Sequence, residues 1–417
     1  MALKWRLCGL LFLATTLNYL DRQTLSILAP TLQRDLHMDN AALGWLFAAF
    51  YYAYTFAQVA VGPILDRVRL RWAFGAAVLV WSIVSAMTGL VTSFTELLVF
   101  RLLLGIAEAA NWPGATRITA GALEPRERAL GNGLFTSGTS IGALIAPALI
   151  FAIATQLNWR WAFVLIGLLG VMWFALWAFS TRDPKLESVW RYEVEEKPVQ
   201  EKSAKASLWR DVSEIVSSPR FVPVLIVAVL VNPCLYFSVN WLPTYFAQQR
   251  GLTPGAQLGW ILTAIYLGLG IGNFLCGTVV LVLTRQGHSL AAAQRTVFLA
   301  ATVPLAACAI VPFVGLGPAV LILIAVNIGL GVWTAIYLTM VQDVAPARVS
   351  TSLGILSGCG SLAGALAMWA VGKVTHETGS FLIPLVALAV AGAISAMAGC
   401  VANRERPVLQ VAHDQIA

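Results

Sequence analysis

The sequence predicts an all-α membrane protein in which twelve transmembrane helices form two six-helix bundles. Three observations support this fold class: the composition, the number of long apolar segments and one polar segment near mid-chain. Hydrophobic residues make up 59% of the 417 residues, charged residues only 11%, and mean hydropathy is +0.78. A soluble domain carries about 25% charged residues, so this chain has too little charge to cover a surface in water. The composition excludes a secreted, disordered or nucleic-acid-binding protein.

Twelve segments are long and apolar enough to cross a membrane as helices, each of which needs about 20 residues. We number these expected spans one to twelve in chain order. They lie at roughly residues 7–31, 43–65, 72–92, 94–117, 130–154, 160–180, 221–248, 257–283, 295–316, 318–342, 350–373 and 380–402.

One long polar segment, residues 182–220, separates the first six spans from the last six. It carries eight basic and eight acidic residues. We therefore expect an N-terminal bundle at residues 1–181, a cytoplasmic central loop at 182–220, a C-terminal bundle at 221–403 and a cytoplasmic tail at 404–417. This pattern is typical of transporters built from two repeats, with the substrate site near the bilayer midplane.

The distribution of lysine and arginine predicts the orientation. With the N-terminus inside, the inner loops and termini hold 21 of the 27 basic residues and the outer loops hold four. Because basic residues concentrate in cytoplasmic loops, we expect both termini to be cytoplasmic in a multi-pass protein.

The orientation is testable at Ser203, in the central segment. A cysteine placed there is expected to resist a membrane-impermeant thiol reagent added to intact cells and to react after the cells are opened. Labelling of intact cells would overturn the orientation.

Four ionisable residues fall well inside expected spans: Asp21, Arg22, Arg101 and Glu108. Each costs about 2.5–3.5 kcal/mol at the bilayer centre, so each needs a reason to be there. One reading is a set of structural ion pairs within the N-terminal bundle. The reading we favour is a site for an anion and a proton, because the four formal charges sum to zero and binding either species changes that sum.

The spacing of these residues favours a shared site. Arg101 and Glu108 are two helical turns apart on one face, about 10 Å along the axis. Asn18 and Arg22 share a face of span one, whereas Asp21 points about 100° away and is expected to face a neighbouring helix. A guanidinium is a planar fork suited to a carboxylate, and a carboxyl group in a low-dielectric site readily takes up a proton.

Span two adds polar-tipped aromatic residues to this group. Tyr54 and Gln58 share a face four residues apart, and Tyr54 is the better candidate to line a site. We interpret Tyr51 and Tyr52 as packing or interface residues.

Several glycines predict close helix contacts. Gly105 lies between Arg101 and Glu108 and lets a helix or a substrate approach, and Gly138 and Gly142 do the same on span five.

Signals for other chemistry are missing from the sequence. The four histidines fall in expected loops or tails, and the six cysteines fall in apolar stretches without a C-x-x-C spacing. We find no metal-ligand cluster, no Ser/His/Asp set and no cofactor-binding loop. We therefore expect no enzymatic activity, no metal and no cofactor.

Two motifs are similar to those of a known family. Gly62-x-x-x-Asp66-Arg67-x-x-x-Arg71 resembles the loop 2–3 signature of the major facilitator superfamily, with Arg69 in place of the usual second glycine. Arg101-x-x-x-Gly105 resembles that superfamily's span-four motif. The resemblance implies that the first motif takes part in conformational gating.

Further stretches resemble one branch of that superfamily, the anion:cation symporters, and within it bacterial hexuronate and galactonate transporters. These stretches are Asn18-Tyr-Leu-Asp-Arg22, Ala53-Tyr-Thr55, Gly105-Ile-Ala-Glu-Ala109, Asn111-Trp-Pro113 and Trp241-Leu-Pro-Thr-Tyr245.

The resemblance implies a role for each residue of the candidate site. Arg22 would contact the substrate carboxylate, with Tyr19 and Tyr54 lining the site. Asp21 and Glu108 would be the protonatable pair, and Arg101 would hold one or the other according to state.

Further substrate-binding candidates come from the second bundle and from span five. Thr139 and Ser357 align where galactonate-type members carry a larger Gln and Asn, which leaves room for a bulkier or less hydroxylated acid. Gln58 completes the candidates of the first bundle, and Asn232 and Tyr236 on span seven are placed by position alone.

We therefore expect a proton-coupled symporter of small organic anions, in particular sugar acids, acting as a monomer in a bacterial inner membrane. Its expected partners are the anion, protons and the lipid bilayer, and not nucleic acid. Uncoupled or exchange-type transport of an organic anion is one alternative. A receptor or sensor built on a transporter frame is an alternative of another class.

Overall fold

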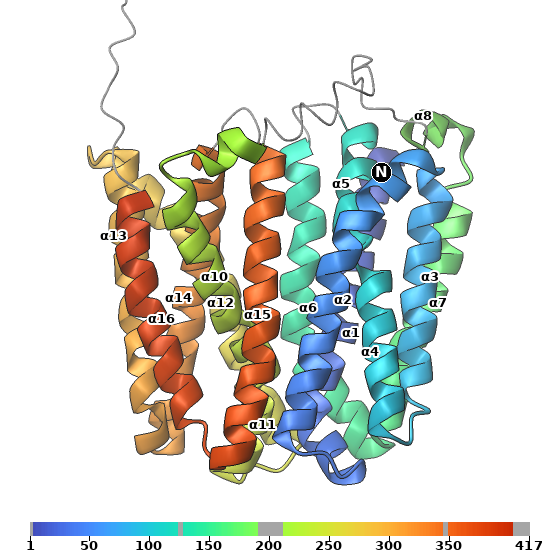
Figure 1. Ribbon diagram of the computed structural model, residues 1–417. Coiled ribbons are helices and arrows are strands. Elements are labelled where there is room, and N and C mark those ends of the chain that lie inside the picture. The colour runs from blue at the N-terminus through green and yellow to red at the C-terminus, as the bar shows by residue number, and fades with distance from the viewer. Residues whose placement is uncertain (1–2, 124–127, 191–211, 345–348, 403–417) are drawn as a thin grey trace, which may run out of the picture.

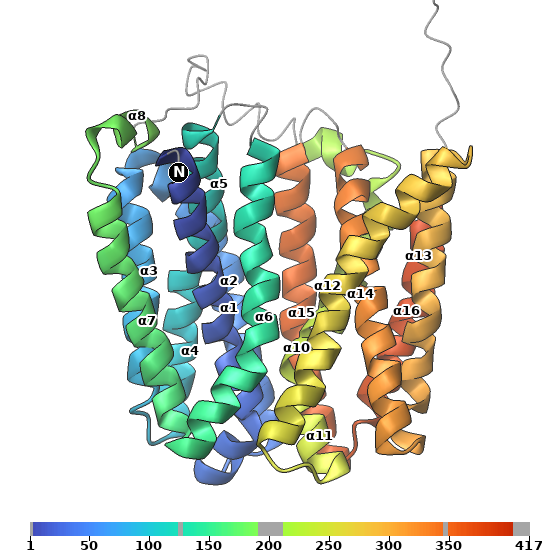
Figure 2. The same ribbon diagram turned by 180° about the vertical axis from the view of Figure 1, so that it is seen from behind.

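The computed structural model describes residues 3–123, 128–190, 212–344 and 349–402, which form helices joined by short turns (Figures 1 and 2). No strand occurs among these residues. The first part of the chain forms α1 (Leu3–Asp35), α2 (Asn40–Arg67), α3 (Leu70–Thr88), α4 (Phe94–Glu108), α5 (Asn111–Ala122), α6 (Arg128–Gln156), α7 (Trp159–Ser180), the 3-10 helix η1 (Pro184–Leu186) and α8 (Glu187–Trp190). The second part forms α10 (Phe221–Asn240), α11 (Leu242–Arg250), α12 (Ala256–Arg285), α13 (Leu290–Ala306), the 3-10 helix η2 (Ala307–Phe313), α14 (Leu316–Val344), α15 (Val349–Thr378) and α16 (Leu382–Ala402).

The fold class is confirmed, and the helices are consistent with twelve membrane spans. Nine helical segments within the described residues are long and apolar enough to cross a membrane. α1, α2 and the α4–α5 pair run alongside them (Figure 1). α1 is less apolar because it carries the buried polar side chains of the candidate site.

Three spans expected to be continuous are interrupted. Span four divides between α4 and α5, span seven between α10 and α11, and span nine between α13 and η2. Proline explains the first two breaks, because it lacks the N–H that would bond to the carbonyl four residues earlier. Pro113 lies just after the first break and Pro243 just after the second.

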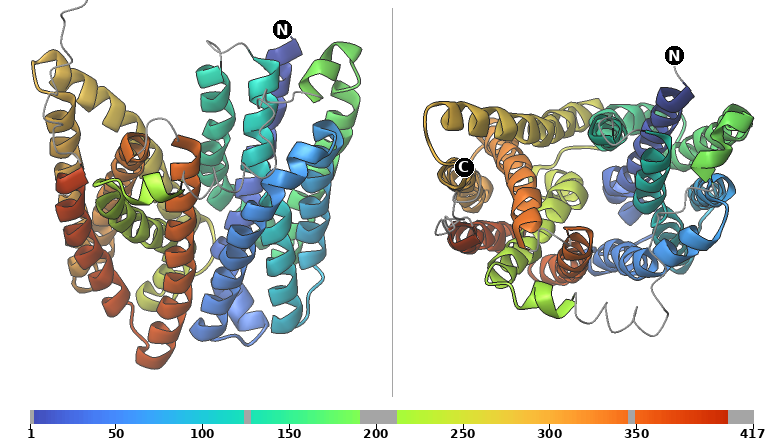
Figure 3. Two further views of the ribbon diagram at one scale, coloured as in Figure 1. Left: turned by 45° about the horizontal axis from the view of Figure 1, so that its top comes forward. Right: turned by 90° about the horizontal axis from the view of Figure 1, so that it is seen from above.

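The helices before and after the central segment gather into two bundles, α1–α7 and α10–α16 (Figure 3). The bundles meet at the end that holds the α1–α2 turn and α11, which we call the closed end, and diverge toward the end that holds the N-terminus (Figure 3). α2 packs extensively on α15, and α6 packs on α12. The residue boundaries of the expected domains stay a prediction, and most of the central loop, like the tail, lies outside the described residues.

The glycines expected to allow close packing do so. A Cβ atom at Gly138 would lie 2.6 Å from the Phe12 carbonyl oxygen of α1, and one at Gly142 would lie 2.7 Å from the Thr16 carbonyl oxygen. On α4, a Cβ atom at Gly105 would lie 2.5 Å from the Phe50 carbonyl oxygen of α2. These contacts bring α6 against α1, and α4 against the tyrosine-bearing turn of α2.

Gly105→Ala is therefore expected to push α2 away from α4 and to lower thermal stability. Overpacking of this kind costs about 1–3 kcal/mol. The measurement is thermal unfolding of the purified protein. Gly270→Ala is the matched control, because no atom lies within 4 Å of its added Cβ. Equal unfolding temperatures for the two variants would contradict the close approach.

The expected gating loop is largely helical. α2 continues through Arg67, so Gly62 and Asp66 belong to its last turns, and Arg71 lies on α3. The side chains of Asp66 and Arg67, and the packing around Gly62, are outside the described part of the structure. Arg71 donates from Nε to Thr181 Oγ1 at 3.0 Å and from Nη2 to the Ala178 carbonyl at 3.0 Å, which ties α3 to the end of α7.

Candidate functional site

A buried ion pair between α1 and α4 lies at the centre of the N-terminal bundle. Arg22 donates to Glu108 Oε2 from Nη2 at 2.9 Å and from Nε at 3.3 Å. Arg22 is 8% exposed and Glu108 is 0% exposed. A buried pair is costly to desolvate and adds little net stability, so its presence inside an apolar bundle points to a functional role.

Three aromatic rings surround the Arg22 guanidinium. Its Cζ lies 5.3 Å from the Tyr19 ring centroid, 4.9 Å from that of Phe50 and 4.9 Å from that of Tyr54. Rings within about 6 Å attract a cation through their negative faces. Tyr19, Phe50 and Tyr54 therefore lie against Arg22. The role of Tyr19 and Tyr54 in lining a substrate site stays a prediction.

Arg101 is buried beside the ion pair and is not hydrogen-bonded to either carboxylate among the described residues. It is 2% exposed, and its Cζ lies 4.6 Å from the Phe50 ring centroid. Within the described residues, none of its side-chain nitrogens has a hydrogen-bond partner. The resemblance implies that Arg101 holds Asp21 or Glu108 according to state, and in this structure Arg22 bonds to Glu108. Both arginines reach the same aromatic ring, and only one is neutralised by a hydrogen-bonded carboxylate.

Asp21 faces away from Arg22, as its position on the helix predicts. The hydroxyl of Ser85 on α3 donates to Asp21 Oδ1, and the Asp21 side chain is buried at 2% exposure. The two carboxyl groups are thus held by different partners, an arginine for Glu108 and a neutral hydroxyl for Asp21.

Several polar atoms around the ion pair are buried without a hydrogen-bond partner among the described residues. They include both amide atoms of Asn18, Oε1 of Glu108 and Oδ1 of Asn111. Buried polar groups are usually paired. These atoms, with the three Arg101 nitrogens, leave donors and acceptors that a polyhydroxylated anion or a proton can engage.

The two candidates on α10, Tyr236 and Asn232, make different contacts. Tyr236 stacks on Tyr51 with ring centroids 3.9 Å apart, and its hydroxyl lies 3.2 Å from Ser361 Oγ. Asn232 instead donates to the Ala228 carbonyl of its own helix at 3.0 Å. Tyr236 therefore reaches the first bundle, and the Asn232 amide bonds within α10.

The other candidate residues are half-buried and are not joined to Arg22. The Thr139 hydroxyl donates to the Thr136 carbonyl of its own helix at 2.9 Å. Gln58 lies one turn from Tyr54 on α2, and Ser357 lies on α15. Among the described residues, neither Gln58 nor Ser357 is hydrogen-bonded to Arg22 or Glu108. Their assignment to the substrate site stays a prediction.

Phe50 was missed in the sequence, and Tyr51, interpreted as a packing residue, packs between the two bundles. Phe50 contacts both arginines and stacks on Tyr54 with centroids 5.8 Å apart. Tyr51, interpreted as packing, accepts a hydrogen bond from Asn240 Nδ2 at 3.2 Å as well as stacking on Tyr236. The four-residue spacing of Phe50, Tyr54 and Gln58 on one helix face was the available signal for Phe50.

No group of three or more His, Cys, Asp or Glu residues within the described ranges is placed to hold a metal ion. The chemistry available at the site is ion pairing, hydrogen bonding and proton transfer to a carboxylate.

Known proteins resemble this chain over most of its length. The family model of the Major Facilitator Superfamily matches residues 11–368. The D-galactonate transporter of Escherichia coli is 26% identical over 401 residues, covering 93% of this chain and 93% of that protein. The hexuronate transporter of Bacillus subtilis is 27% identical over 382 residues, covering 89% of this chain and 88% of that protein.

A solved structure shares the fold. It is a bacterial homolog of the human lysosomal transporter Spinster, in an inward-facing and unoccupied conformation. It aligns with a TM-score of 0.78 at 19% identity, covering 98% of this chain and 99% of that one. The family match spans both bundles and includes the buried ion pair. This chain therefore belongs to the Major Facilitator Superfamily, a family of membrane transporters rather than enzymes.

Proposed function

We propose that this protein is a proton-coupled symporter of sugar acids that works by alternating access in a bacterial inner membrane. The names of its relatives support the substrate class, because they include transporters of galactonate and hexuronate. The observation that carries the proposal is the buried ion pair between Arg22 and Glu108.

The ion pair supports coupling because one guanidinium has two carboxylates competing for it. In this structure, Arg22 is hydrogen-bonded to Glu108. A substrate carboxylate that binds Arg22 displaces Glu108 or shares its cation. A buried carboxylate without its own cation is costly, and taking up a proton removes that cost. Anion binding and proton binding then favour each other, and thermodynamic linkage makes the effect reciprocal.

The shape of the molecule supports alternating access. The bundles are joined at the closed end and diverge toward the end that holds the N-terminus (Figure 3). In the orientation expected from the basic residues, the closed end faces the outside. This structure then corresponds to an inward-open state, and the cycle requires the closed end to separate.

Purified protein in proteoliposomes tests the proposal. Radiolabelled galactonate, a hexuronate and a short monocarboxylate are offered with and without an inward proton gradient. Accumulation of a sugar acid above its outside concentration, lost on adding a protonophore, is the expected result. Uptake that merely equilibrates and ignores the gradient would show an uncoupled carrier. Binding without any uptake would show a receptor.

A further inference from the structure

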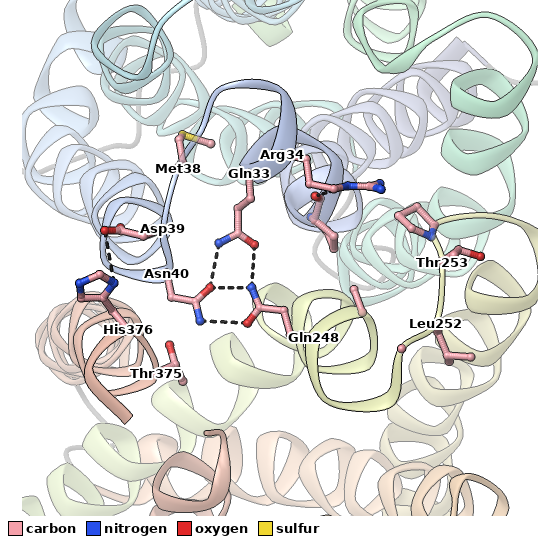
Figure 4. Close-up of a pocket in the computed structure, with 14 residues that line it drawn as sticks. Gln33, Arg34, Met38, Asp39, Asn40, Gln248, Leu252, Thr253, Thr375 and His376 are labelled. Atoms are coloured by element: carbon pink, nitrogen blue, oxygen red, sulfur yellow. Dashed lines mark hydrogen bonds and ion pairs between the residues drawn. The ribbon is translucent and has the colours of Figure 1, made fainter. Parts of the chain in front are cut away.

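Three side-chain amides join the two bundles at the closed end (Figure 4). Gln33 lies near the end of α1, Asn40 begins α2, and Gln248 lies on α11 of the other bundle. We call these three residues the amide latch. Their amides converge on one point from three helices, as the dashed lines in Figure 4 show.

Four hydrogen bonds connect the latch. Gln33 Nε2 donates to Asn40 Oδ1 at 2.8 Å within the first bundle. The other three cross between the bundles. Asn40 Nδ2 donates to Gln248 Oε1 at 3.0 Å, and Gln248 Nε2 donates to Asn40 Oδ1 at 2.9 Å and to Gln33 Oε1 at 3.2 Å. Separation of the bundles must break all three crossing bonds together.

The latch borders a pocket of about 490 Å³ that is also lined by Arg34, Thr253 and His376. Gln248 is exposed, whereas Gln33 and Asn40 are 8% and 9% exposed. Water reaching the pocket can therefore replace the latch bonds as they break. Neutral amide bonds that exchange with water contribute little net free energy each. A contact of this kind holds an end shut reversibly, which a gate requires.

A backbone crossing beside the latch depends on the same closure. A Cβ atom at Gly372 on α15 would lie 2.4 Å from the Asn40 carbonyl oxygen and 2.7 Å from Gly44 Cα. No side chain fits between α2 and α15 at this point. The crossing therefore forms only when the closed end is fully shut.

A third contact uses a carbonyl that proline leaves without its helical partner. Pro243 has no N–H to offer the carbonyl of Val239, four residues earlier. Ser26 on α1 donates to this oxygen at 2.5 Å, and Tyr266 on α12 donates to it at 3.2 Å. The break between α10 and α11 thus provides an acceptor for the opposite bundle, as broken membrane helices do when neighbouring side chains satisfy them.

We propose that Gln33, Asn40 and Gln248 form the outer gate latch of this transporter, and that their three crossing hydrogen bonds set the balance between outer-closed and outer-open states. The assignment of the closed end to the outside rests on the proposed function. The latch itself is a property of the bundle contact. Removing it favours separation of the closed end, and a side chain at Gly372 prevents closure altogether.

The test measures the distance between two spin labels across the closed end by pulsed electron paramagnetic resonance spectroscopy. Spin labels are placed at Leu157, in the turn after α6, and at Glu377, on the last turn of α15, after the native cysteines are replaced. Both residues are exposed, and they belong to opposite bundles. Detergent-purified protein without substrate is used. Asn40→Ala, Gln248→Ala and the double variant are expected to raise the ratio of the long-distance to the short-distance population, by about tenfold for the double variant.

Gln249→Ala is the matched control. Gln249 is the neighbouring exposed glutamine, and its Nε2 donates to the Gly379 carbonyl at 2.9 Å within its own bundle. The Gln249→Ala variant should leave the distance distribution unchanged. Gly372→Leu should remove the short-distance population. A size-exclusion profile and an unfolding temperature confirm that each variant is folded.

Two results would overturn the latch: an unchanged distribution in the double variant, or an equal shift in Gln249→Ala. Because no substrate or proton gradient enters this measurement, its outcome is separate from the transport assay. Failure of sugar-acid uptake, together with a tenfold change in the population ratio of the double variant, would refute the proposed function and leave the latch standing.

Discussion

Arg22→Lys is expected to lose most of the affinity for the anion while leaving the protein folded. The guanidinium of Arg22 bonds to Glu108 through two nitrogens and lies against three aromatic rings. An ammonium keeps the charge but has neither the planar fork nor the flat face that stacks on rings. Loss of a charged hydrogen bond costs about 1.5–3 kcal/mol, which corresponds to roughly 10- to 150-fold in affinity.

The measurement for Arg22→Lys is ligand-dependent thermal stabilisation, followed by uptake in proteoliposomes. Arg295→Lys is the control, because Arg295 is an exposed arginine on α13, in the other bundle. Affinity within twofold of the unmodified protein would remove Arg22 from the substrate site. The proposed competition with Glu108 would then fail as well.

Glu108→Gln is expected to separate binding from coupling. The amide keeps the shape of the protonated carboxyl group and cannot release a proton. The variant should therefore bind sugar acid and exchange it between loaded sides, since Arg22 no longer has Glu108 as a competing carboxylate. Concentrative uptake should be lost. In a coupled carrier, each unit of imposed pH gradient can drive about tenfold accumulation of substrate per co-transported proton.

Three assays decide the result for Glu108→Gln: binding, exchange at equal pH, and uptake with an imposed gradient. Glu377→Gln, an exposed change on the last turn of α15, is the control. Asp21→Asn, whose carboxyl group is held by Ser85, should show a separable defect if two protons move. Accumulation by Glu108→Gln at the normal level would exclude this residue as the coupling site and transfer that role to Asp21 or to none.

The sequence predicts which ionisable side chains belong to the candidate site, because a charge inside an apolar span is costly wherever it lies. It does not predict which of them pair. Arg22 and Glu108 are 86 residues apart, and their contact depends on how α1 and α4 are rotated about their axes. Helical spacing places Arg101 and Glu108 on one face, but it cannot show that a guanidinium from another helix reaches Glu108 first.

The contacts of the closed end could not be predicted from the sequence, for a different reason. Gln33, Asn40 and Gln248 carry no charge and lie at expected span ends, where polar residues are ordinary. Their significance depends on the contact between two bundles in one state of the molecule. The helix break after α10 has a visible cause in Pro243, but only the structure shows that Ser26 occupies the carbonyl it leaves free.

The four buried ionisable residues also determine how the membrane potential acts on the proposed cycle. If Asp21, Arg22, Arg101 and Glu108 are all ionised, the empty site carries no net charge, and its return across the membrane involves no electrical work. A potential of 100 mV contributes about 2.3 kcal/mol per elementary charge moved. With one proton a monoanion crosses without current, and with two it carries one positive charge inward. The sign and size of the substrate-evoked current would therefore count the protons directly.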